Sequence, residues 1–167
     1  DGNANTQDIC HVGRGCMHVV IDPAQSNSQV TFQPASGHRF LDLSSEYITT
    51  YTSTDSNYIG SPIAACGETG GFFHIQGFAT LILTRVSMTG NHFNMSCTSS
   101  QGFTKGAAIA IENGQVQLNW VSCWNNTAQK GGCVYMNDKS TLSMFRSSIV
   151  NNTAGPDGGG GLRHEPA

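Results

Sequence analysis

Three segments of this chain repeat one pattern of glycines and apolar residues. They span residues 70–91, 106–126 and 131–152, and a fourth repeat begins at 158–162. Each of the three opens with glycine, continues with three stretches in which apolar residues alternate with others, and closes with asparagine. That alternation is typical of a strand with one buried face. Because one such unit cannot bury its own apolar face, the repeat predicts a stack of similar coils.

The aligned repeats place like residues in columns. The columns are Gly70, Gly106 and Gly131; Phe73, Ile109 and Val134; Ile75, Ile111 and Met136; Leu81, Val116 and Leu142; Leu83, Leu118 and Met144; and Met88, Cys123 and Ile149. Parallel, in-register stacking at about 4.8 Å per coil requires such columns. We therefore predict that residues 1–167 form a single all-β domain, a right-handed parallel β-helix (solenoid) with three short strands per coil. At about 25 residues per coil the chain holds about six coils.

The two parts of the chain differ in how clearly they repeat. The three clear repeats and the start of the fourth lie in 70–162. Residues 1–69 are expected to form an N-terminal cap and irregular coils. Within them, 29–34 and 39–43 are predicted strands, and 48–62 are predicted to be a loop or an irregular coil.

The asparagine that closes each repeat stands at Asn91, Asn126 and Asn152. Asparagine tolerates a left-handed backbone, and its amide can bond the equivalent side chain in the next coil. The matched register favours an inward asparagine ladder at one corner of the helix. The alternative is three unrelated turn residues.

The same repeats resemble those of a known superfamily. Gly-Gly-apolar openings, a following S/T-x-L-x-L/M pattern and a terminal Asn-Asn-Thr-Ala look like the repeats of the pectin-lyase-like superfamily, most closely the polymorphic outer-membrane-protein type. Residues 106–109 and 131–134 match the opening, and 121–126 and 147–152 match the asparagine end. The resemblance implies the parallel β-helix fold over 70–162. It implies no single function, because that superfamily holds polysaccharide lyases, glycoside hydrolases, adhesins and structural fibres.

The chain holds an even number of cysteines, which suits an oxidising compartment. They are Cys10, Cys16, Cys66, Cys97, Cys123 and Cys133. Cys10 and Cys16 lie in CHVGRGCMH, whose Cys, His and Met residues suit a metal or, as we favour, a small disulfide loop.

The other four cysteines lie in or beside the repeats. Cys66 and Cys97 flank the first repeat and can staple the insertion at 92–105. Cys123 falls in an inward column, so it is either a buried thiol or the partner of Cys133.

Three sequons of the form Asn-x-Ser/Thr begin at Asn94, Asn125 and Asn151. Two of them recur at one place in the repeat, which chance does not explain. Together with the cysteines and a start at Asp1, they favour a secreted, N-glycosylated protein of a eukaryotic secretory pathway. N-linked glycans are the only non-protein groups expected.

Charge and hydropathy exclude two kinds of partner. Charged residues make up 11% of the chain and the formal net charge is -3, which provides no basic surface for nucleic acid. No apolar run is long enough to cross a bilayer.

The repeats contain few residues that indicate a catalytic site. Polysaccharide lyases of this shape need clustered acids to hold calcium together with a basic residue, and glycosidases need a carboxylate pair. The acids of the repeat region are Glu68, Glu112, Asp138 and Asp157, and no two share a column. We therefore predict no catalytic residue and no metal site, with a polysaccharide lyase- or hydrolase-like enzyme as an alternative.

Arg85, Trp120 and Arg146 occupy one outward column in successive coils. The two guanidinium groups can sandwich the indole in a cation–π stack. This column is either a self-satisfied surface stack or a platform for a sugar ring, as in a carbohydrate-binding adhesin.

The repeat pattern starts again at the end of the sequence. In Gly158–Ala167 a new coil opens without a polar cap, although a soluble solenoid needs one. Either the chain is a fragment of a longer solenoid or another chain covers this end. Because head-to-tail contacts do not close, the expected function is a structural protein that stacks end to end into an extracellular filament or cell-surface fibre.

Overall fold

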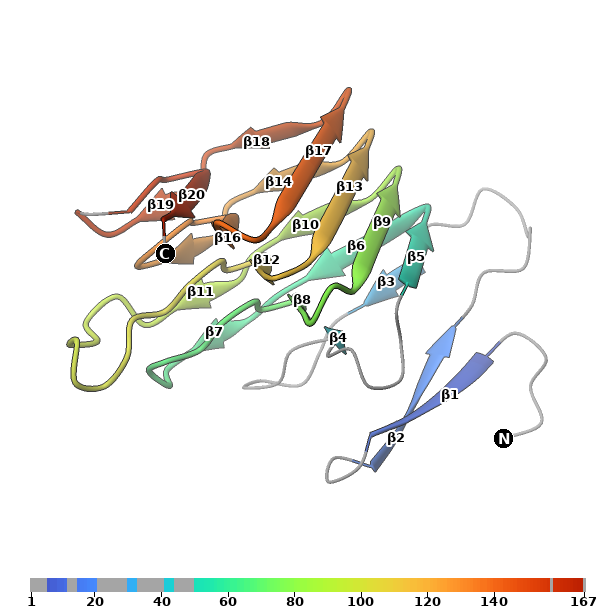
Figure 1. Cartoon of the computed structure of the whole chain (residues 1–167), viewed down its shortest axis with the longest axis horizontal. Helices are drawn as coiled ribbons and strands as arrows, with labels where there is room; N and C mark the ends of the chain where they lie inside the picture. Colours follow the sequence, from blue (N-terminus) through green and yellow to red (C-terminus); the bar gives the residue numbers. More distant parts are fainter. Residues whose placement is uncertain are drawn as a thin grey trace.

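The computed structural model describes residues 6–11, 15–20, 30–32, 41–43, 50–156 and 158–166, with side chains described from residue 50 onward. All regular elements in these ranges are β-strands, and they form four parallel sheets and one antiparallel hairpin (Figure 1). The fold class predicted from the repeats, an all-β parallel β-helix, is confirmed. Within the described ranges no helix is long and apolar enough to span a bilayer.

The chain passes through the four sheets in turn and then starts the next coil. The first sheet holds β5 (Thr50–Thr54), β9 (Thr80–Thr84), β13 (Gln115–Asn119) and β17 (Thr141–Phe145). The second holds β3 (Val30–Phe32), β6 (Ser56–Ile59), β10 (Ser87–Thr89), β14 (Ser122–Trp124) and β18 (Ser148–Val150).

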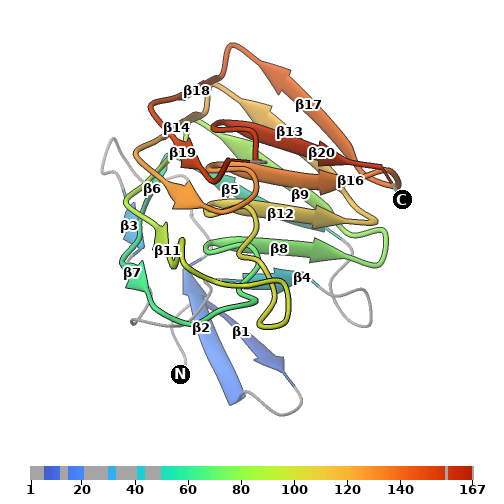
Figure 2. The same cartoon turned by 90° about the vertical axis from the view of Figure 1, so that its left-hand side faces the viewer.

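The third sheet holds β7 (Pro62–Ile63), β11 (His92–Phe93), β15 (Thr127–Ala128) and β19 (Thr153–Ala154). The fourth holds β4 (Leu41–Leu43), β8 (Phe73–Gln76), β12 (Ile109–Glu112), β16 (Val134–Asn137) and β20 (Leu162–Glu165), which Figure 2 shows stacked one above another. The hairpin joins β1 (Thr6–His11) to β2 (Gly15–Val20).

Two details of the coil differ from the expectation. Each complete coil has four strands, not three, because a two-residue strand follows the closing asparagine. Two residues are too short to reveal an alternating period, so the repeat pattern alone could not show this strand. The sheets hold four or five levels in the described residues, compared with the expected total of about six coils.

The strand register reproduces the predicted columns. Leu81, Val116 and Leu142 pair in sequence across β9, β13 and β17. The other apolar columns of the alignment are also in register, in the second and fourth sheets as well as the first. Their inner side chains form one buried core in which the largest fully buried residues are Tyr58, Phe72, Phe73, Ile75, Leu81, Leu83, Met88, Ile109, Ile111 and Leu118.

Steric contacts explain why each repeat opens with glycine. Gly106 and Gly131 have φ values of 54° and 63°, in the left-handed region. A Cβ on Gly106 would lie 2.2 Å from the carbonyl oxygen of Ile109, and a Cβ on Gly131 would lie 2.1 Å from that of Val134. Only glycine fits this corner, which is why it recurs in the sequence.

The prediction of a loop or irregular coil at 48–62 is wrong, because β5, β6 and β7 form a regular coil there. Its inner positions carry polar residues where later coils carry aliphatic ones. Tyr58 is fully buried and donates a hydrogen bond to Ser53 Oγ at 2.8 Å, and Ser53 Oγ donates to Ser56 Oγ at 3.1 Å. The polar groups satisfy one another, so the coil needs no aliphatic pattern to be buried.

Two disulfides join described residues. Cys66–Cys97 ties the segment after β7 to the segment after β11, one coil further on. Cys123–Cys133 joins β14 to the residue before β16, so Cys123 is not a free thiol. The predicted disulfide of the N-terminal hairpin concerns side chains outside the described part, although the backbone pairs Cys10 with Cys16 across β1 and β2.

Candidate functional site

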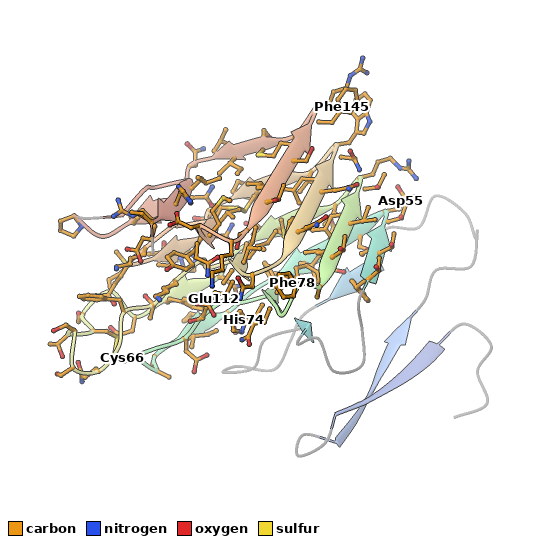
Figure 3. The ribbon with its side chains drawn as sticks, in the orientation of Figure 1. Asp55, Cys66, His74, Phe78, Glu112 and Phe145 are labelled. Atoms are coloured by element: carbon orange, nitrogen blue, oxygen red, sulfur yellow. A yellow bond between two sulfur atoms is a disulfide. The ribbon has the colours of Figure 1, made fainter. Side chains whose placement is uncertain are left out.

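A column of large polar and aromatic side chains lines the corner between the first and second sheets. It consists of Asp55, Arg85, Trp120 and Arg146, here called the corner column. Each follows a strand of the first sheet, and the backbone N–H of Arg85 donates to Asn119 O at 2.9 Å. The corresponding bond from Trp120 goes to Phe145 O, also at 2.9 Å. Figure 3 labels Asp55 and Phe145 along this edge.

All four residues of the corner column have a left-handed backbone. Their φ values are 51° for Asp55, 53° for Arg85, 58° for Trp120 and 48° for Arg146. The sharp turn from one sheet to the next requires this conformation, which glycine adopts without strain. A bulky residue such as tryptophan rarely occupies it.

Trp120 is packed on one side by the coil above it. The Arg146 guanidinium carbon lies 4.6 Å from the centre of the indole, a cation–π contact. The Phe145 ring meets the indole edge-on, with ring centres 6.4 Å apart. Trp120 still exposes 51% of its surface and Phe145 exposes 55%.

The predicted arginine–tryptophan–arginine sandwich is only half formed. Arg85 instead binds Asp55 in the preceding coil through two hydrogen bonds, Nε to Oδ1 at 2.5 Å and Nη2 to Oδ2 at 2.6 Å. These bonds lower the pKa of Asp55 below its ordinary value and raise the pKa of Arg85. A carboxylate is a stronger partner for guanidinium than an indole face, so the bidentate pair prevails.

The three closing asparagines lie together at the next corner, between the second and third sheets. Asn91 and Asn126 are buried, with 1% and 0% exposure. Asn126 Oδ1 accepts the backbone N–H of Asn91 at 3.1 Å, and Asn152 Oδ1 accepts that of Asn126 at 3.0 Å. Asn126 Nδ2 also donates to Asn152 Oδ1 at 3.0 Å. These residues form an asparagine ladder that ties three coils together.

The sequon asparagines differ in accessibility. Asn125 and Asn151 are exposed, and the backbone N–H of Asn125 donates to Asn151 O at 3.2 Å, so the two lie on adjacent coils. Asn94 is half-buried and its amide donates to Ala64 O at 2.9 Å. Glycosylation of all three stays a prediction.

A polar network on the outer face of the fourth sheet was missed from the sequence. Glu165 in β20 accepts hydrogen bonds from Lys130 Nζ at 2.5 Å and from the Tyr135 hydroxyl at 2.9 Å. Burial would raise the pKa of Glu165, but these two bonds and the positive charges of Lys130 and Lys105 together outweigh it and lower the pKa. Burial and the bond to Glu165 raise the pKa of Tyr135.

A second pair on this face joins His74 Nε2 in β8 to Glu112 Oε2 in β12 at 2.9 Å (Figure 3). In both groups the strand residues stand at outward positions of the aligned repeats. Polar and charged residues at those positions are the sequence signal that could have indicated these interactions. In the described ranges no three His, Cys, Asp or Glu side chains lie close enough to hold a metal ion.

The coil of β17 to β20 leaves the inner columns uncovered. Met144 is 41% exposed and Leu162 is 39% exposed, although their register partners Leu118 and Val134 in the coil below are fully buried. Leu142 and Ile149 are half-buried. The outer edges of all four sheets lie on this face (Figure 1).

No protein-family model matches the sequence, and no curated protein and no solved structure is significantly similar to the chain. The fold class therefore rests on the strand pairing alone, which defines a disulfide-bonded, all-β parallel solenoid. Two disulfides fit an oxidising, extracellular environment. The resemblance to the pectin-lyase-like superfamily stays a prediction.

Proposed function

We propose that this chain is a secreted, N-glycosylated structural protein whose β-helices stack end to end into a filament. The observation that supports it best is that two inner columns are exposed in the coil of β17 to β20, at Met144 and at Leu162. Completely burying such side chains stabilises an association by about 1.5–3 kcal/mol each. An open edge of five residues at β17 would add main-chain hydrogen bonds by β-augmentation.

The occupant we propose for this end is a second copy of the chain. At the opposite end of the stack, β3 places Phe32 in register with the buried Tyr58. There β4 places Leu41 in register with the buried Phe73. Phe32 and Leu41 therefore share register columns with core residues of the next coil. Joining unlike ends gives a contact that does not close, and such contacts produce filaments.

The test is negative-stain electron microscopy and light scattering of the purified protein over a range of concentrations. We expect rods that lengthen with concentration, and shorter particles for the double variant Met144→Lys, Leu162→Lys. Phe78→Lys is the matched control, because Phe78 is 78% exposed but lies in the turn before β9. Monodisperse monomers at every concentration, or a double variant that assembles like the wild type, would contradict the proposal.

A further inference from the structure

We propose that Trp120, together with the Asp55–Arg85 pair, binds the flat face of a neutral pyranose ring. This site lies on the lateral corner of the solenoid and is independent of the proposed filament. The ligand class we infer is a β-1,4-linked chain of gluco-configured sugars, whose equatorial hydroxyls leave the ring faces lined with C–H groups.

The first argument is the open face of the indole. Arg146 covers one face at 4.6 Å, and Phe145 meets the ring edge-on. The other face of Trp120 has no aromatic or cationic partner among the described residues, and 51% of the residue is exposed. An aromatic face carries negative charge density and attracts the partly positive C–H groups of a sugar ring.

The second argument is the neighbouring polar pair. Arg85 lies one coil below Trp120 in the corner column and Asp55 lies two coils below it, and the bidentate contact between them ties the guanidinium to the carboxylate instead of to the indole. The pair presents carboxylate lone pairs and guanidinium N–H groups along the corner column below Trp120, and these match the donors and acceptors of vicinal hydroxyls. The charges of this pair cancel and Arg146 contacts the indole from the coil above, so the Asp55–Arg85 side offers a ligand hydrogen bonds without a net charge of its own, as a neutral sugar requires.

The third argument is the backbone of the corner. Trp120 has a φ of 58°, in a conformation that glycine adopts freely and a bulky side chain rarely adopts. At the next corner of the same coil the left-handed residue is Asn125, with a φ of 54°. A strained tryptophan that exposes half of its surface is better explained by binding than by folding.

The geometry also explains how Asp55 acts. If Asp55 is removed, Arg85 becomes free to stack on the open face of Trp120, as the sequence pattern alone suggested. That stacking would close the platform. Asp55 is therefore a positioning residue that keeps the indole accessible.

The experiment is isothermal titration of the whole protein with cellohexaose, with β-1,4-mannohexaose as the comparison because its axial hydroxyl interrupts one ring face. We expect saturable binding of cellohexaose and weaker binding of mannohexaose. Trp120→Gly is expected to weaken binding about tenfold or more and Asp55→Ala to weaken it by a smaller factor. Trp120→Gly keeps a residue that tolerates the left-handed corner, so its melting temperature should equal or exceed that of the wild type.

Trp124→Ala is the matched control, because Trp124 lies in the same coil and is 44% exposed. It should bind cellohexaose like the wild type. No saturable binding of cellohexaose, unchanged binding by a folded Trp120→Gly, or loss of binding in Trp124→Ala while Trp120→Gly still binds would each overturn the proposal.

Discussion

Replacing Asn126 by alanine tests whether the asparagine ladder holds the coils together. Asn126 is completely buried, and its side chain contacts the coil on each side. Its Oδ1 accepts the N–H of Asn91 at 3.1 Å. Its Nδ2 donates to Met88 O at 3.2 Å and to Trp124 O at 2.9 Å. Alanine removes all of these bonds while leaving the sequon at Asn125 intact.

The expected cost follows from which groups lose their partners. The N–H of Asn91 would be left buried without an acceptor, which costs about 1–3 kcal/mol. Each lost hydrogen bond from Nδ2 to a backbone carbonyl adds about 1 kcal/mol. We therefore expect Asn126→Ala to lower the free energy of unfolding by roughly 3–5 kcal/mol, a large fraction of the stability of a typical domain.

The assay is urea denaturation followed by far-ultraviolet circular dichroism and by tryptophan fluorescence, which together show whether unfolding is two-state. Asn125→Gly, in protein made without glycans, is the control. Asn125 is exposed and left-handed, so this change should alter the free energy of unfolding by less than about 0.5 kcal/mol. A cost below about 1 kcal/mol for Asn126→Ala would refute the reasoning that the ladder stabilises the stack.

Three further predictions concern the disulfide, a carboxylate and the glycans. Replacing Cys66 and Cys97 by alanine opens a loop of 31 residues and should lower the free energy of unfolding by about 3–4 kcal/mol in a denaturant titration. The depressed pKa of Glu165 adds stability above its ordinary pKa of 4.5, and this stability is lost as the pH falls through the folded-state pKa. Glu165→Gln should therefore melt below the wild type at pH about 7, and the difference should shrink as the pH falls below 4.5, as calorimetry would show. Expressed in a eukaryotic secretory host, Asn125→Gln and Asn151→Gln should each lose the mass of one glycan by mass spectrometry, and equal masses would contradict the sequon assignment.

The parts of the fold that could be predicted from the sequence are those whose buried positions carry aliphatic residues. The register of Leu81, Val116 and Leu142 follows from the alternation of apolar and other residues, which aligns the repeats directly. The coil at 50–63 was not recognised because its inner positions include Ser53 and Tyr58, whose polar atoms are satisfied by hydrogen bonds to other polar side chains of the same coil. Such pairing exists in three dimensions and leaves no periodic mark on the sequence.

The error in the corner column has the same origin. Arg85 and Trp120 could be placed in one column because both belong to clear repeats. Asp55 could not, because its coil was not recognised, and so the ion pair that draws Arg85 away from the indole was not foreseen. The asparagine ladder, in contrast, involves residues of the clear repeats and could be inferred from the register alone.

The left-handed corners of one coil differ in which residue types their backbones accept. At Gly106 a side chain would collide with a carbonyl 2.2 Å away, so glycine is obligatory. Trp120 stands at a corner where glycine would also fit the backbone, and a left-handed conformation costs a residue with a side chain about 1–2 kcal/mol. Its exposed contact with Arg146 returns only about 0.5–1 kcal/mol. The edge-on contact with Phe145 adds about 0.5–1.5 kcal/mol, so the contacts of Trp120 within the fold about balance the cost of its backbone. A ligand on the exposed half of the tryptophan would supply the net gain that the fold itself does not.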